Sequence, residues 1–137
     1  MTSGAAAAPK GSRTLLVSVG LTPQVVTETL HTLVARDWIP DRLVLLTTVA
    51  GAAACRDLLL APDGALDRYA ASWEAPFAAR LARTAVVVTV ETDDGDLGDA
   101  RSAALFADRA LELVRTLSDE VGGSLHVSVA GGRKPVA

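Results

Sequence analysis

The chain has 137 residues, half of them hydrophobic and only 4% aromatic, with a formal net charge of −3 and an isoelectric point near 5.3. This length favours a single domain with a core of Ala, Val and Leu, and the acidic balance argues against a protein that binds long nucleic acids along a basic stripe. The single cysteine, Cys55, excludes an intrachain disulfide and argues against a zinc site built from cysteines.

Residues 1–12 are rich in Ala, Gly and Ser and lack the apolar region of a signal peptide, so we expect a flexible N-terminal tail. No apolar run approaches the roughly 18 residues that a membrane span requires. A free thiol also suits the reducing cytoplasm. We therefore expect a cytoplasmic protein without membrane contact, with one domain at residues 13–137.

Residues 13–20 (RTLLVSVG) form an apolar, β-branched run that ends in glycine, and they predict a buried first strand. A helix is expected to follow and to run to about Arg36, because its apolar residues recur at 3.6-residue spacing. Thr22 is the expected N-cap of this helix, and Pro23 fits its first turn.

Residues 42–48 (RLVLLTT) predict a second buried strand, and a helical stretch is expected over residues 51–60. Residues 62–64 (PDG) are typical of a turn. The Ala-rich segment 65–81 predicts a helix that is interrupted near Pro76.

Residues 86–92 (VVVTVET) predict a third strand, followed by an acidic loop at residues 93–99. A long helix is expected over residues 101–120, ended by the glycines at 122–123, and a fourth strand over residues 125–130 (LHVSVA). The expected buried face of the long helix consists of Ala104, Ala107, Leu111, Val114, Leu117 and Val121.

Strands therefore alternate with helices, and the strands are near-continuous apolar runs, as is typical of parallel strands covered on both faces. With right-handed crossovers this order predicts an α/β fold, a Rossmann-like three-layer sandwich with a mainly parallel sheet. Ligands bind outside the carboxyl ends of the strands in such sheets, so we expect the site in the loops that follow the strands.

The loop after the first strand, Gly20-Leu21-Thr22-Pro23-Gln24, places a hydroxyl and a carboxamide at the start of a helix. Unpaired N–H groups and the positive end of the helix dipole favour a phosphate there. The alternative is that Thr22 serves only as the N-cap, which the spacing alone favours. Thr47 and Thr48 end the second strand and are expected at the same edge of the sheet.

The loop Gly131-Gly132-Arg133-Lys134 directly follows the last predicted strand. Its two glycines tolerate positive φ angles, so that successive N–H groups can form an anion-binding nest, and Arg133 and Lys134 add two cations. The loop matches neither the Walker pattern nor the dinucleotide fingerprint. The alternative is a polar loop with solvated charges, and the residues alone favour neither interpretation.

We expect structural or solvated positions for the other polar candidates. They are Asp93, Asp94, Asp96 and Asp99, the histidines His31 and His126, the serines Ser18 and Ser128, and Cys55. The acidic loop is short, which favours a solvated turn over a divalent-metal site. Each histidine lies inside a predicted helix or strand, which favours a place in or beside the core over a role as general base.

The segments VSVGLTPQVVTETLHTL (residues 17–33) and LHVSVAGGRK (residues 125–134) together resemble the CRISPR-associated Rossmann-fold family, abbreviated CARF. More narrowly, TPQVVTETL near the start and AGGRK later resemble its ring-nuclease-like branch. LTT with a following glycine (residues 46–51) and LGDARS (residues 97–102) are similar to the same branch. The resemblance spans about residues 13–134, and its specificity comes from the two end motifs together.

The resemblance implies a protein that binds cyclic oligoadenylates, the second messengers of type III CRISPR defence, as a homodimer with the ring across the two-fold axis and without a cofactor. It also implies metal-independent cleavage, with cyclic tetra-adenylate favoured, in which the ligand's own ribose 2′-hydroxyl attacks and a linear product with a 2′,3′-cyclic phosphate results. The implied catalytic residues are Thr22, Arg133 and Lys134. The implied ligand-binding residues are Gly20, Leu21, Thr22, Pro23, Gln24, Thr48, Gly131, Gly132, Arg133 and Lys134.

The sequence departs from this family at its end, because members usually continue past GGRK with a further helix, whereas here Pro135-Val136-Ala137 is last. We therefore expect a natural truncation or a fragment, with apolar sheet surface exposed. The leading hypothesis is a ring nuclease. The alternatives are a non-catalytic sensor that acts through a partner, and a Rossmann-like binder of another nucleotide.

Overall fold

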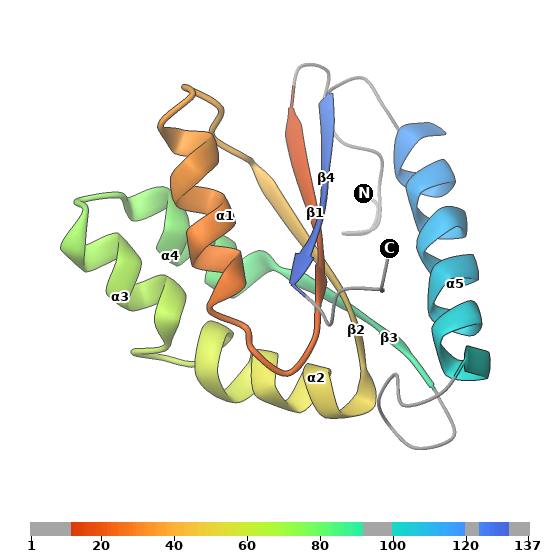
Figure 1. Cartoon of the computed structure of the whole chain (residues 1–137). Coiled ribbons are helices and arrows are strands. Elements are labelled where there is room, and N and C mark those ends of the chain that lie inside the picture. Colours follow the sequence, from red (N-terminus) through yellow and green to blue (C-terminus); the bar gives the residue numbers. More distant parts are fainter. Residues whose placement is uncertain (1–11, 92–99, 120–123, 132–137) are drawn as a thin grey trace, which may run out of the picture.

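The structure, a computed structural model, describes residues 12–91, 100–119 and 124–131. Within them, four parallel strands form one sheet in the order β3-β2-β1-β4 (Figure 1). The strands are β1 (Arg13–Val19), β2 (Arg42–Thr48), β3 (Val86–Val90) and β4 (Ser124–Gly131). The α/β fold with a parallel sheet, predicted from the sequence, is confirmed.

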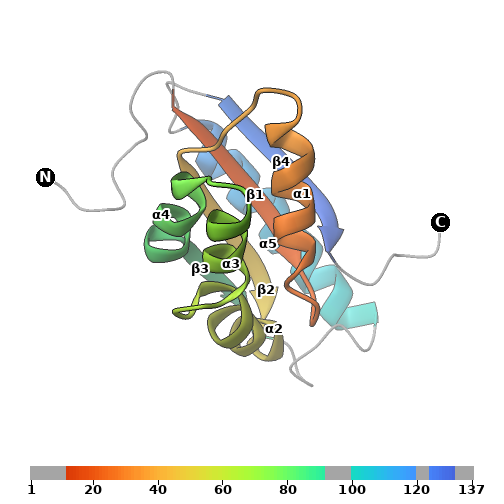
Figure 2. The same ribbon diagram turned by 90° about the vertical axis from the view of Figure 1, so that its left-hand side faces the viewer.

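Helices cover both faces of this sheet, which gives the predicted three layers (Figure 2). One face carries α1 (Val25–Val34), α2 (Val49–Ala54), α3 (Ala65–Ser72) and α4 (Pro76–Thr84), with a π-helical segment, η1 (Cys55–Leu60), between α2 and α3. Among the described helices, α5 (Ala100–Asp119) alone covers the opposite face.

Successive side chains of β1 point to opposite faces of the sheet and belong to two cores, one under each helical layer. Leu15 and Val17 are fully buried on the side of α1, where Val26 belongs to the same cluster. Leu16 points to the other face and shares a second cluster with Phe106 of α5. Because both faces of β1 are covered, the strand is apolar at nearly every position, which is why the sequence showed a continuous run rather than alternation.

The strand order reverses between β1 and β4. From β1 the chain moves to β2 and then β3 through helices on one face, and α5 then crosses the opposite face to reach β4 on the other side of β1 (Figure 1). Right-handed crossovers that travel in opposite directions require this change of face. The point of reversal is where open parallel sheets bind their ligands, outside the carboxyl ends of the strands.

The buried face of α5 agrees only in part with the one that the sequence predicted. Leu117 is buried and Val114 partly buried, but Ala104 and Ala107 are exposed and Leu111 is 52% exposed. The buried positions are Ser102, Phe106, Leu113 and Leu117. Leu117 is common to both stripes, but Phe106 is buried in place of Ala107 and Leu113 in place of Val114, because the larger side chains bury more apolar area. Val121 lies outside the described residues. In the described parts of the chain, no helix combines the length and the apolar character needed to cross a membrane.

The other elements differ from prediction mainly at their ends. β1 stops at Val19 and β3 at Val90, each somewhat earlier than expected. α1 stops at Val34, before a turn in which Asp37 has a φ of 61°. The predicted break near Pro76 is confirmed, because α3 ends at Ser72 and Pro76 is the first residue of α4.

Candidate functional site

The carboxyl ends of the strands lie together at one edge of the sheet, at the bottom of Figure 1. At this edge Val19, the last residue of β1, is paired with Gly131, the last residue of β4. The turn after β1 therefore leaves the sheet beside the point where the described part of β4 ends. This is also the point at which the strand order reverses.

The turn between β1 and α1 is built differently from the prediction. α1 begins at Val25, and its N-cap is Gln24, whose side chain makes no capping hydrogen bond. The Val25 N–H donates to the Thr22 carbonyl at 3.4 Å and the Val26 N–H donates to the Pro23 carbonyl at 3.0 Å. The prediction that Thr22 is the N-cap is wrong, because Pro23 and Gln24 form a tight turn between it and the helix.

This turn presents polar groups to solvent. Leu21 is 54% exposed, Thr22 and Gln24 are exposed, and the buried ring of Pro23 anchors the turn to the protein. Among the described residues, no hydrogen bond donated by the N–H of Leu21, Thr22 or Gln24 is found. Together with the positive end of the α1 dipole, such N–H groups are suited to an anion. The alternative interpretation of Thr22, a purely capping role, no longer accounts for its position.

The two threonines at the end of β2 have defined structural partners. The Thr47 hydroxyl is fully buried and donates to the Val19 carbonyl at 2.7 Å. The Thr48 hydroxyl accepts from the Gly51 N–H at 3.2 Å and thereby caps α2, which begins at Val49 and not at Gly51 as predicted. Thr48 is 2% exposed, so its predicted contact with a ligand stays a prediction, while Thr47 is bonded to the last residue of β1, directly before the turn.

β4 is irregular where it reaches this edge. Val17 is paired with Ser128 and Val19 with Gly131, so β4 advances three residues while β1 advances two. Such a bulge bends its strand and is over-represented beside active sites. Gly132, Arg133 and Lys134 lie outside the described residues, and their roles stay predictions.

The two histidines lie away from this edge. His31 is in α1, and its Nδ1 is 3.0 Å from the hydroxyl oxygen of Tyr69 in α3. His126 is in the first half of β4, and its ring centre is 5.6 Å from that of Trp38. Both positions agree with the structural role expected from the sequence.

Cys55, in η1, is fully buried, and burial raises the pKa of its thiol to about 11. It is therefore protonated at neutral pH and packs as a small apolar residue, as expected. The four aspartates of the predicted acidic loop lie outside the described residues. In the ranges that are described, no three His, Cys, Asp or Glu side chains gather in a way that would hold a metal ion.

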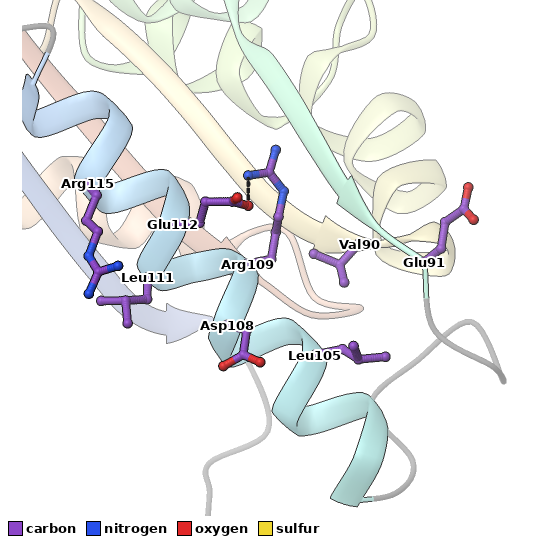
Figure 3. A pocket seen from close by; sticks show the side chains of 8 residues that line it. All are labelled: Val90, Glu91, Leu105, Asp108, Arg109, Leu111, Glu112 and Arg115. Atoms are coloured by element: carbon purple, nitrogen blue, oxygen red, sulfur yellow. Dashed lines mark hydrogen bonds and ion pairs between the residues drawn. The ribbon is translucent and has the colours of Figure 1, made fainter.

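An open groove of about 530 Å³ lies elsewhere, between the end of β3 and α5 (Figure 3). Its lining residues are Val90, Glu91, Leu105, Asp108, Arg109, Leu111, Glu112 and Arg115. The lining carries three carboxylates and only two guanidinium groups, and the Arg109 guanidinium is paired with the Glu112 carboxylate at 2.9 Å, so the groove does not favour an anionic ligand. This groove has no signal in the sequence, because it depends on how α5 lies across the sheet.

Residues 22–137 match the sequence profile of the protein family described as CRISPR-associated protein NE0113. This match covers most of the chain, including residues 22–24 of the turn after β1 and the predicted GGRK loop. No curated protein and no solved structure matches the chain.

Proposed function

Because this chain belongs to the family of CRISPR-associated protein NE0113, it has a role in CRISPR defence, and we propose that it binds and cleaves a cyclic oligoadenylate. The binding site in this proposal is the carboxyl edge of the sheet between β1 and β4. The resemblance of the TPQVVTETL and AGGRK segments to CARF ring nucleases supports the choice of ligand, with cyclic tetra-adenylate favoured.

The observation that carries the proposal is the position of Thr22. Its side chain is exposed, caps no helix, and stands at the point where the strand order reverses. A hydroxyl beside the N-terminus of α1 fits a phosphate of the ring, with the N–H groups of the turn and the helix dipole adding to the attraction.

The second half of the site comes from the segment after β4. Lys134 follows Gly131 by three residues, and three residues of extended chain span at most about 11 Å. Gly131 is paired with Val19, the residue before the turn that holds Thr22, and this pairing supports the assignment of Arg133 and Lys134 to the same proposed site. Arg133 supplies a planar fork for phosphate oxygens and Lys134 a point charge.

The proposed chemistry needs positioning more than an acid–base pair. The ribose 2′-oxygen attacks the adjacent phosphorus, the bond from phosphorus to the 5′-oxygen breaks, and the proton lost by the 2′-hydroxyl is balanced by one gained at the 5′-oxygen. The products are a 2′,3′-cyclic phosphate and a free 5′-hydroxyl. In-line geometry supplies much of the rate, and Lys134 with Arg133 stabilises the charge that develops on the phosphate.

A ring with two-fold symmetry fits a homodimer better than a single chain. In this proposal two copies bring their carboxyl edges together, so that each supplies one Thr22 and one GGRK loop to one half of the ring. This arrangement predicts one ring for two chains, which distinguishes it from a site contained within each chain.

The test is to incubate the purified protein with cyclic tetra-adenylate and cyclic hexa-adenylate in EDTA and to analyse the products by chromatography and mass spectrometry. A linear adenylate with a 2′,3′-cyclic phosphate supports a metal-independent ring nuclease. An intact ring that raises the melting temperature indicates a non-catalytic sensor. An intact ring without any thermal shift contradicts the proposal and indicates a different nucleotide.

A further inference from the structure

The end of β1 departs from regular strand pairing on both sides, toward β2 and toward β4. Toward β2, the regular register ends at Ser18 and Leu46. The next carbonyl on β1, that of Val19, accepts a hydrogen bond from the buried Thr47 hydroxyl at 2.7 Å. Toward β4, the bulge between Ser128 and Gly131 falls at the same level. The direction in which β1 enters its turn therefore depends on a side chain of β2.

Gly51, in the first turn of α2, completes this contact. A methyl group built at Gly51 would overlap the Thr47 Oγ1 atom and would lie 2.9 Å from the Gly20 carbonyl oxygen. Only a residue without a Cβ atom allows α2 to pack this closely against both Thr47 and the turn. The beginning of α2 and the turn after β1 accordingly lie next to each other at the bottom of Figure 1.

We propose that Thr47 and Gly51 act as a positioning pair that sets the conformation of the Gly20–Gln24 turn and thereby places Thr22 against the phosphate. The ligand in this inference rests on the proposed function, whereas the effect of Thr47 and Gly51 on the conformation of the turn does not. Thr47 is fully buried, so it reaches the ligand only through Val19 and the turn. Thr48, its neighbour, instead caps α2.

The first experiment compares Thr47→Val with Thr47→Ser. Valine keeps the shape but removes the hydroxyl and leaves the Val19 carbonyl without its donor, whereas serine keeps the donor. In isotope-labelled protein without ligand, we expect Thr47→Val to shift the amide signals of residues 20–22 and 24, the turn residues that carry an N–H, and Thr47→Ser to leave these signals near their wild-type positions. Gly51→Ala should move the same signals, because the added methyl group pushes α2 away from the turn.

Two matched controls separate positioning from loss of stability. Thr14→Val makes the same change at a buried threonine at the opposite end of β1. Gly64→Ala adds a methyl group 2.8 Å from the Ala61 carbonyl oxygen, a clash similar to that at Gly51 but at the start of α3. Gly64→Ala should lower the melting temperature, and both controls should leave the amide signals of residues 20–22 and 24 unchanged.

The second readout is binding and cleavage of cyclic tetra-adenylate at a temperature where every variant is folded. Misplacement of the turn should lower the cleavage rate of Thr47→Val by roughly 10- to 100-fold, with recovery in Thr47→Ser and little change in the two controls. If wild-type protein neither binds nor cleaves the ring, the proposed function is overturned, but the positioning role of Thr47 is not. If the amide signals of residues 20–22 and 24 do not respond to Thr47→Val, the positioning role is overturned, whether or not the protein binds or cleaves the ring.

Discussion

Val19 on β1 is paired with Gly131 on β4, at the place where the strand order of the sheet reverses. This pairing joins two sequence segments that are more than a hundred residues apart, the turn with Thr22 and the segment that leads to Lys134. The candidate site therefore depends on the pairing of β1 with β4, and each of the two segments can be tested separately.

Thr22→Ala should weaken binding of cyclic tetra-adenylate without loss of stability. The hydroxyl caps no helix, so its removal should change the free energy of unfolding by no more than about 0.5 kcal/mol. Loss of a hydrogen bond to a charged phosphate should raise the Kd roughly 10-fold or more. Calorimetric titration and thermal melts of the same samples measure both effects.

Thr32→Ala is the matched control, because Thr32 lies on the exposed side of the same helix and its hydroxyl donates to the Glu28 carbonyl at 3.1 Å. It should leave ring binding unchanged. A Thr22→Ala protein that melts at a lower temperature but binds the ring normally would return Thr22 to a purely structural role.

Lys134→Ala should slow ring cleavage by about 100-fold, since it removes a cation from the phosphate on which charge develops. Single-turnover cleavage with excess protein measures this rate without interference from product release. Lys10→Ala, which changes the only other lysine of the chain, has the same effect on net charge and should cleave at the wild-type rate. Equal cleavage rates for the wild type, Lys134→Ala and Lys10→Ala would mean that Lys134 takes no part in cleavage.

The two apolar stripes of α5 predict opposite outcomes for two substitutions. Phe106 is buried against the sheet, so Phe106→Ala should lower the free energy of unfolding by about 3 kcal/mol or more. Leu111 is 52% exposed, so Leu111→Ala should change it by no more than about 0.5 kcal/mol. Urea denaturation measures both values, and a larger loss for Leu111→Ala would mean that α5 lies in the orientation that the sequence predicted.

The success of the fold prediction and the failure at α5 have one physical explanation. Strands β1 and β2 are buried on both faces, so their apolar runs are unambiguous, and the glycines and prolines between elements mark the turns. α5 is covered on one side and carries two apolar stripes, and only packing against the sheet decides between Phe106 and its neighbour Ala107.

The pairing of the ends of β1 and β4, where the site is proposed, was predictable from the sequence, but the detail of this region was not. Strand order and the rule for parallel sheets direct attention to the loops after β1 and β4. The role of Thr47 was not predictable, because its bond to Val19 joins residues 28 apart and depends on the pairing of β1 with β2. The N-cap prediction at Thr22 failed because Pro23 fits a turn before a helix as well as the first turn of one.

The buried thiol of Cys55 gives the protein a specific dependence on pH. Burial raises the pKa of this thiol in the folded protein from 9.0 to about 11. Between these two pH values the unfolded chain has lost the proton and the folded chain still holds it. The contribution of the thiol to stability is therefore fully present below pH 9 and is lost as the pH rises toward 11.

The urea midpoint should therefore decrease more between pH 8 and pH 10.5 in wild-type protein than in Cys55→Ala. The variant keeps every other titrating group, including Tyr69, whose pKa is also raised by burial. An equal decline in both proteins would mean that the thiol is accessible to water in the folded state.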